Sequence, residues 1–287
     1  MRKYIFIVIC ILFGIVAFSF IDNLVKEGNN MNKDNKSEII ENNPEDKDNE
    51  IPLEFSTVTT FKEENYERYL NYKNNNPNLS DEEIVMRINV FLDYNFYEKK
   101  IEALNKNTPL ILVNKYYYID DTYIPDNLVE VSIKYASGGS IYADSEAVSH
   151  FALMCNDASA VNLSIKTISA YRSYDYQKKL YEGYLKNDTV ASVDTYSARA
   201  GHSEHQTGYA FDVYDSKNPY TSFGDTDEFE WVKINAHKYG FIVRYTEENS
   251  YITGYKNEPW HLRYVGVDAA TYIYQNNITL EEYLLNK

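Results

Sequence analysis

The sequence is poor in cysteine and in basic residues, and both shortages exclude classes of protein. Its 287 residues include only two cysteines, Cys10 and Cys155, and no CxxC pair. A disulfide framework and a cysteine-rich metal site are therefore excluded. Lysine and arginine together number 28 against 43 aspartates and glutamates, which gives a net charge of -15. So acidic a protein is poorly suited to neutralise a phosphate backbone, which argues against nucleic-acid binding.

The sequence also lacks an HExxH pair, the commonest zinc-protease signature, and it shows no internal repeat. Hydrophobic residues make up 44% of the chain, which is enough for a sizeable core. From residue 53 to the end the composition stays globular, without a second linker. We therefore expect a single domain over residues 53–287.

Residues 1–21 combine a short positive flank with a long apolar run. Arg2 and Lys3 precede an uncharged run of 18 residues, 4–21, close to the roughly 20 residues that span a bilayer as a helix. This pattern predicts an uncleaved membrane anchor. A cleaved signal peptide is the alternative, because residues 17–19 form a weak small-x-small cleavage site. In both interpretations the positive flank stays in the cytoplasm, and the rest of the chain lies outside the cell.

Residues 22–52 have the composition of a disordered linker. They carry nine acidic and four basic residues, many asparagines and few clustered apolar side chains. Such a segment cannot bury enough apolar surface to offset the entropy lost on ordering. We expect a flexible tether between the membrane and the domain.

Hydrophobic periodicity after residue 53 predicts a mixture of helices and strands. We expect helices over residues 62–74, 143–157, 174–186 and 226–239, and one more that opens at Ser80 with Glu83 completing a capping box. We expect strands over residues 110–113, 128–133, 165–169, 209–214, 241–245 and 260–265. The elements follow no regular βαβ repeat, which favours an α+β fold. Cys155 lies on the apolar stripe of its helix and is expected in the core.

Two groups of residues in the second half carry the chemistry. His205 precedes a glycine, and Asp212 lies in the strand that follows, flanked by Phe211 and Val213. Strand alternation places Asp212 on the face opposite these two apolar neighbours. A carboxylate in such a strand is costly to bury unless it is paired or binds a metal.

The second group is Glu258-Pro259-Trp260-His261, in which an acid lies three residues before a histidine. Together with His205 and Asp212, these residues could supply three ligands, an open position and a base. That is the composition of a catalytic zinc site.

These residues resemble a known family, the VanY-type D-alanyl-D-alanine carboxypeptidases, within the group that also contains lysostaphin-like peptidases and hedgehog domains. An SxHxxGxAxD motif runs over residues 203–212, and an ExxH motif over residues 258–261. Further similarity lies in residues 169–173 with Gln177, in 201–208, in 239–245 and in 253–255. The likeness covers roughly residue 55 to the end. One departure is Ala200, where the family usually has proline.

The resemblance implies a role for each matching residue. Zinc, one ion per chain, would be bound by His205, Asp212 and His261. Glu258 would be the general base that takes a proton from the activated water and passes it to the leaving amine. Arg172 would hold the terminal carboxylate of the substrate or the developing oxyanion, and Ser203 and Gln177 would be polar contacts to the same peptide end. For His202, which lies inside the motif, we expect a supporting position behind the ligands.

The expected function is that of a membrane-tethered zinc carboxypeptidase acting on peptidoglycan stem peptides outside the cell. The resemblance implies removal of a terminal D-alanine, from a D- or from an L-centre, and an α+β domain whose small antiparallel sheet carries the zinc site. Two alternatives are a peptidoglycan endopeptidase and a catalytically silent, zinc-containing wall-binding module. An intact Glu258 argues against the silent module.

Overall fold

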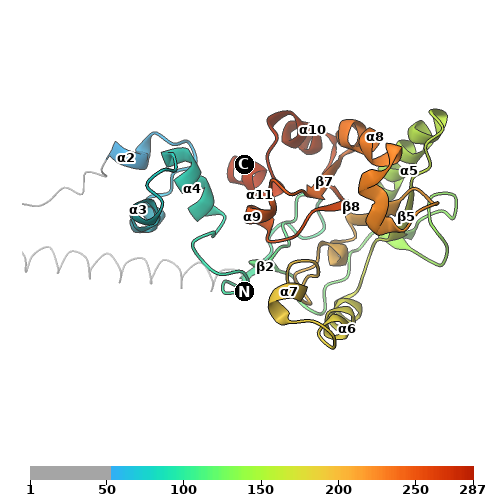
Figure 1. Cartoon of the computed structure of the whole chain (residues 1–287), viewed down its shortest axis with the longest axis horizontal. Helices are drawn as coiled ribbons and strands as arrows, with labels where there is room; N and C mark the ends of the chain where they lie inside the picture. Colours follow the sequence, from blue (N-terminus) through green and yellow to red (C-terminus); the bar gives the residue numbers. More distant parts are fainter. Residues whose placement is uncertain (1–52) are drawn as a thin grey trace, which may run out of the picture. The chain divides into compact units, whose positions relative to one another are not determined.

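The second half of the chain is built around a four-stranded antiparallel sheet (Figure 1). The computed structural model describes residues 53–287. The strands of this sheet lie in the order β5–β6–β8–β7. Their bounds are β5 Lys166–Ser169, β6 Ala210–Tyr214, β7 Phe241–Tyr245 and β8 Glu258–Tyr264. Two smaller sheets precede it, a parallel pair of β1 Ile101–Glu102 with β2 Tyr117–Tyr118 and an antiparallel pair of β3 Leu128–Glu130 with β4 Tyr142–Asp144.

Helices surround these strands. The α-helices are α2 Leu53–Ser56, α3 Tyr66–Asn75, α4 Asp81–Asn89, α5 Ser145–Ala160, α6 Tyr174–Tyr184, α7 Val190–Val193, α8 Asp227–Asn235, α9 Ser250–Thr253, α10 Val267–Asn276 and α11 Leu280–Leu285. The 3-10 helices are η1 Glu63–Asn65, η2 Glu204–Thr207, η3 Tyr220–Asp225 and η4 Ala236–Tyr239. The predicted anchor (residues 1–21) and linker (residues 22–52) lie outside the described residues. Among residues 53–287, no helix is both long and apolar enough to cross a membrane.

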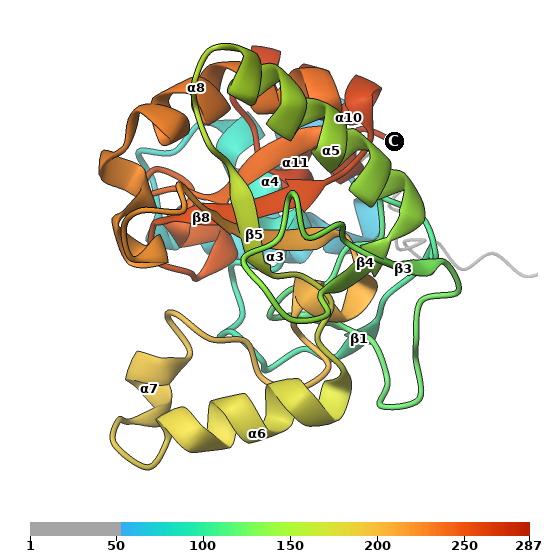
Figure 2. The ribbon, with the colours of Figure 1, turned by 90° about the vertical axis from the view of Figure 1, so that its right-hand side faces the viewer.

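Helix α5 packs on one face of the sheet and forms the main core there (Figure 2). The Phe151 ring stacks on Phe211 of β6, with ring centroids 4.8 Å apart, and meets Phe241 of β7 edge-on at 6.0 Å. Cys155 on the same helix is only 4% exposed and is a free cysteine. The prediction that it is a core residue is therefore confirmed.

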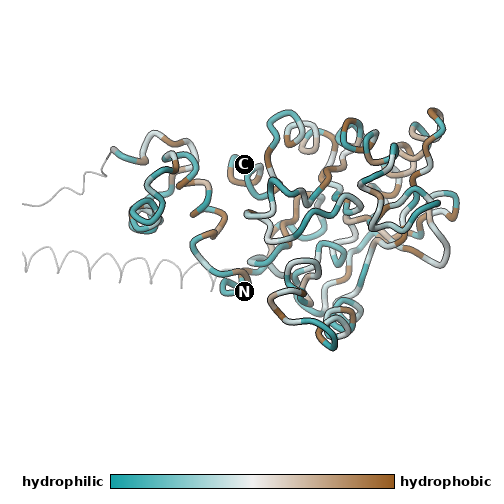
Figure 3. The backbone as a smooth tube through the Cα atoms, in the orientation of Figure 1, coloured by the Kyte–Doolittle hydropathy of each residue, from teal (hydrophilic) through white to brown (hydrophobic). Residues whose placement is uncertain are grey.

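The opposite face of the sheet is polar around Asp212, while Ile242 of β7 belongs to a second apolar cluster with residues of α10 and α11. Asp212 of β6 lies between Phe211 and Val213 in sequence, and both of these neighbours belong to the apolar core. Alternation along the strand then directs Asp212 to the other side, as predicted. Hydrophobic and hydrophilic residues accordingly interchange over short distances along the described chain (Figure 3).

The helices before the sheet have a small core of their own. Buried side chains of α2, α3 and α4, including Phe55, Tyr69 and Ile84, form a separate apolar cluster. Helix α4 begins with the predicted capping box. The Ser80 hydroxyl accepts from the Glu83 N–H at 3.2 Å, while the Glu83 carboxylate accepts from the Ser80 N–H at 3.0 Å.

One predicted strand is wrong. Residues 110–113 form no strand, although Ile111 and Val113 are fully buried. The Arg263 guanidinium donates to the carbonyl oxygens of Pro109 and Ile111, at 2.9 and 2.7 Å. A side chain thus satisfies the carbonyl groups that strand pairing would otherwise engage. The predicted elements from residue 143 onward are confirmed with ends shifted by a few residues, and the predicted strand at 128–133 is reduced to β3.

The stack of α5 on the sheet gives a stability prediction. Phe151→Ala should lower the free energy of unfolding by about 3–5 kcal/mol, because it leaves a cavity beneath Phe211 and Phe241. Leu153→Ala is the matched control on the same helix, since Leu153 is 56% exposed, and should change stability by only about 0.5 kcal/mol. Urea unfolding of the three proteins measures both effects. Equal losses would contradict this account of the core.

Candidate metal centre and active-site pocket

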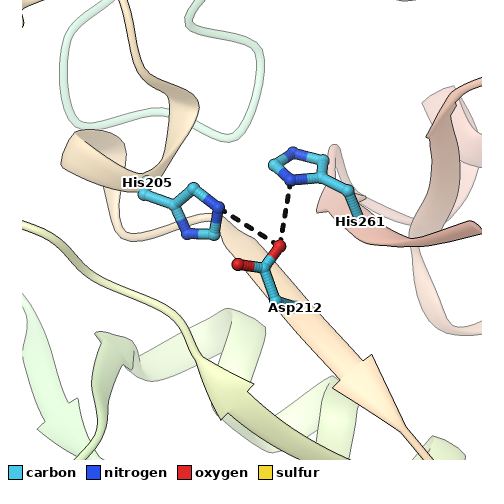
Figure 4. Close-up of side chains that lie close together, drawn as sticks. All are labelled: His205, Asp212 and His261. Atoms are coloured by element: carbon cyan, nitrogen blue, oxygen red, sulfur yellow. Dashed lines mark hydrogen bonds and ion pairs between the residues drawn. The ribbon is translucent and has the colours of Figure 1, made fainter. Parts of the chain in front are cut away.

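Three side chains from three elements, η2, β6 and β8, converge on the polar face of the sheet (Figure 4). Asp212 of β6 is paired directly with His261 of β8 in the antiparallel register. His205 lies on η2, and the residue that follows this helix, Gly208, has a φ of +79° that lets the chain turn into β6. All three side chains are buried, with 4–5% exposure.

The two imidazole rings direct one nitrogen each to the same carboxylate oxygen. His205 Nε2 lies 3.3 Å from Asp212 Oδ1, and His261 Nδ1 lies 3.2 Å from it. Each ring has an acceptor at its other nitrogen. His205 Nδ1 lies 2.6 Å from the Ala170 carbonyl oxygen, and His261 Nε2 lies 3.1 Å from Glu204 Oε2. Histidine ligands of metals have this arrangement, because an outer acceptor keeps the inner nitrogen free to coordinate. The residues therefore fit a zinc ion.

The ionisation of the cluster provides one carboxylate and one neutral imidazole, while the second imidazole holds a proton. Burial opposes ionisation of Asp212, yet the neighbouring His205 and Arg172 hold its pKa well below the usual range. Burial and Arg172 lower the pKa of His205 to about 4, which leaves its imidazole neutral. Burial also lowers the pKa of His261, but the hydrogen bonds to Asp212 and Glu204 outweigh it and raise that pKa to about 9. A metal would thus displace a proton from His261.

Glu258 reaches the same pocket because β8 is irregular. Residues three apart in a regular strand project to opposite faces, yet Glu258 and His261 both line one pocket. The pairing of β7 with β8 shifts register between Val243 and Tyr245. Pro259, which has no N–H to donate to a neighbouring strand, lies within this irregular stretch of β8. Glu258 is 8% exposed, and burial raises its pKa to about 7.

Arg172 lies at the pocket and holds Asp212. Its Nη2 donates to Asp212 Oδ2, and its Nε donates to the Ser169 hydroxyl at 2.9 Å. Among residues 53–287, no hydrogen bond from Nη1 to a protein group is formed. The arginine predicted to face the substrate is therefore anchored by two contacts and keeps one nitrogen for a third.

The two predicted polar contacts also line the pocket. Gln177 is 1% exposed, and its Nε2 donates to the Ala198 carbonyl oxygen at 2.8 Å. This bond orients the amide and leaves its buried Oε1 without a partner among the described residues. Ser203 is the N-cap of η2, yet its hydroxyl caps no backbone N–H there.

The pocket has a volume of about 320 Å³ and an aromatic wall. Its aromatic lining residues are Tyr184, Tyr196, Tyr220, Tyr245, Tyr255 and Trp260. Trp260 lines the pocket and makes a T-shaped contact with Tyr220, with ring centroids 5.2 Å apart.

Among residues 53–287, no hydrogen bond joins the His202 side chain to His205, Asp212 or His261. The Nδ1 of His202 is 2.7 Å from the Asn114 carbonyl oxygen, so it does not support a ligand directly.

The sequence reasoning missed Glu204. Its side chain is fully buried beside His261 and is paired with Arg244 and Arg263. The only signal in the sequence was its place next to His205, inside the motif. Its two arginine partners lie about forty and sixty residues away, and only the fold reveals them.

Comparison with known proteins identifies the family. The family model of D-alanyl-D-alanine carboxypeptidase (VanY) matches residues 140–267. The chain is 38% identical over 195 residues to the putative carboxypeptidase YodJ of Bacillus subtilis (strain 168), a match that covers 64% of this chain and 71% of YodJ. The chain belongs to the VanY family. The predicted resemblance is therefore confirmed.

Solved VanY-family structures have the same fold. The LdcB LD-carboxypeptidase superposes with a TM-score of 0.60 at 37% identity, over 64% of this chain and 88% of LdcB. VanYB in complex with D-alanine-D-alanine has a TM-score of 0.52 at 32% identity, over 61% of this chain and 97% of VanYB. A mutant of the vancomycin-resistance D,D-pentapeptidase VanY in complex with Zn(II) has a TM-score of 0.52 at 32% sequence identity. That match covers 61% of this chain and 98% of the mutant chain. The expected mixed helix–sheet fold and the expected zinc carboxypeptidase class are confirmed at this family level.

The raised pKa of Glu258 predicts how stability changes with pH in the metal-free protein. The unfolded chain releases this proton near pH 4.5, whereas the folded protein keeps it up to about pH 7. Stability contributed by this group therefore falls as pH rises through this window. Glu258→Gln has no carboxyl group to ionise and does not lose this stability. Its free energy of unfolding, relative to that of wild type, should therefore rise by about 2–3 kcal/mol from about pH 5 to about pH 8. Urea unfolding of both proteins in the presence of chelator measures this change. A difference in unfolding free energy that stays constant with pH would contradict the prediction.

Proposed function

We propose that this VanY-family protein is a zinc-dependent carboxypeptidase that removes the terminal D-alanine from peptidoglycan stem peptides. The observation that carries the proposal is the convergence of His205, Asp212 and His261 with Glu258 in one pocket. Similarity to an LD-carboxypeptidase and to VanYB bound to D-alanine-D-alanine supports the substrate class.

His205, Asp212 and His261 would hold the zinc ion. When bound, zinc would supply Lewis-acid activation of water and polarisation of the scissile carbonyl group. Glu258 is suited to move the proton, because its pKa of about 7 lets it both accept and release a proton near neutral pH. It would take the proton from the attacking water and deliver it to the nitrogen of the leaving D-alanine.

Three polar side chains would hold the end of the peptide. The free Nη1 of Arg172 would donate to the terminal carboxylate, which is the substrate's fixed negative charge. Gln177 Oε1 can only accept, so it would bind a peptide N–H. Ser203 would contribute its hydroxyl at the same end. The aromatic wall would then pack against the preceding residues of the stem.

We also propose that the domain works outside the cytoplasmic membrane. The apolar run of residues 4–21 with its positive flank supports this place, and stem peptides of the cell wall are found there. Residues 22–52 would then serve as the tether that the sequence predicts.

The first test separates the ligands from the base. Glu258→Gln should keep about one zinc per chain, because all three ligands remain, while turnover of a stem peptide should fall by roughly 10²–10⁴-fold. His261→Ala should lose the zinc. Metal content and peptide cleavage, followed by mass spectrometry on the same preparations, measure both. Full zinc occupancy in His261→Ala would overturn the ligand assignment, and near-normal turnover in Glu258→Gln would overturn the role of the base.

The second test asks whether a free carboxylate is required. Amidating the C-terminus of the peptide removes one charge-assisted contact with Arg172, worth about 1.5–3 kcal/mol. Cleavage should therefore slow by roughly ten- to a hundredfold. Arg172→Ala should cleave the acid and the amide at similar, low rates. Equal rates of wild type on both peptides would favour an endopeptidase. A pentapeptide and a tetrapeptide offered side by side would separate D,D- from L,D-cleavage.

A further inference from the structure

Glu204 lies on the far side of His261 from the proposed metal position. Its Oε2 is 3.1 Å from His261 Nε2, whereas the nitrogen that faces Asp212 is Nδ1. The imidazole ring therefore stands between Glu204 and the other two ligands. Glu204 is accordingly not a member of the ligand cluster, although its side chain is completely buried.

Two guanidinium groups fix the other oxygen of this carboxylate. Arg244 Nε donates to Glu204 Oε1 at 2.8 Å, and Arg263 Nη1 donates to the same oxygen at 3.0 Å. Both arginines are at most 1% exposed. Donors on Oε1 and an imidazole on Oε2 together prevent the carboxylate from rotating.

The arginines are themselves held in place. Arg244 forms a two-bond pair with Glu281 of α11, with N···O distances of 2.9 and 2.7 Å. Arg263 donates to the carbonyl oxygens of Pro109 and Ile111. Both arginine partners of Glu204 thus have a second anchor in a different part of the chain.

We propose that Glu204 is a positioning residue for the metal ligand His261, an inference that rests on the proposed zinc site. Its carboxylate accepts the Nε2–H of the ring, which keeps the Nδ1 lone pair directed at the metal position and makes that nitrogen a better donor to a cation. Carboxylates behind histidine ligands act in this way, and their loss typically costs roughly 10- to 100-fold in metal affinity.

The amide variant gives the sharpest prediction. In Glu204→Gln, the side-chain oxygen should stay with the two guanidinium groups, because these can only donate. The NH2 group then faces His261 Nε2 and can also only donate. Nε2 must accept, and the ring proton moves to Nδ1, the atom that should coordinate. Zinc affinity should therefore fall even though the shape of the side chain is kept.

Glu281→Gln is the matched control. Glu281 is also buried and also paired with Arg244, but it does not touch a ligand. Each variant removes one negative charge from the same buried network. A purely structural role for Glu204 predicts that the two variants behave alike.

The experiment measures zinc dissociation constants by competition with a chromophoric chelator, together with thermal unfolding of the metal-free proteins. We expect Glu204→Gln to bind zinc roughly 10- to 100-fold more weakly than wild type, and Glu281→Gln to stay within a few-fold. Equal zinc affinities in the two variants would overturn the proposal.

A second variant keeps the test decisive if Glu204→Gln fails to fold. Glu204→Asp preserves the charge that the arginines require but is one methylene too short to reach His261. It should fold and still bind zinc more weakly than wild type, and wild-type affinity in this variant would overturn the proposal. The readout does not depend on cleavage. A wild-type protein that binds zinc but cleaves no stem peptide would overturn the proposed function alone.

Discussion

The antiparallel pairing of β6 with β8 is the constraint on which the site depends. It places Asp212 opposite His261, and backbone hydrogen bonds along both strands fix that separation. The same alternation directs Phe211 and Leu262, which are also paired, into the core beneath α5. One register thus determines both the core and the ligand cluster. A slip of a single residue would reverse the two faces and lose both.

The polar face shows how the fold tolerates charge away from water. Glu204, Arg244, Arg263 and Glu281 are all buried, and isolated charges there would cost several kcal/mol each. Each carboxylate meets a guanidinium, and Arg263 also donates to backbone carbonyl oxygens. The network therefore joins the C-terminal helix, two strands and the segment around residue 110 into one support beneath the pocket.

Much of the site could be predicted from the sequence, because its signals are local. Alternation alone separated Asp212 from Phe211, and the family resemblance pointed to His205, Asp212 and His261, which the fold does bring together. What escaped prediction depends on contacts between distant residues. The sequence pointed to Glu258 beside His261, but not to the register shift of β8 against β7 that brings both side chains into one pocket. The apolar run at residues 110–113 was mistaken for a strand, because its carbonyl partner, Arg263, lies about 150 residues away.

The pairing of Arg172 with Asp212 has a consequence for the order of assembly. The Arg172 guanidinium neutralises the Asp212 carboxylate, and His261, whose pKa is raised to about 9 by its two carboxylate neighbours, carries a further positive charge. The sheet is held by its own apolar core, unlike a small zinc domain that is unfolded without its ion. The chain can therefore complete its fold first and exchange a proton for a metal afterwards. Folding that does not wait for the ion leaves the zinc to be loaded at any later time, from whatever supply is then at hand.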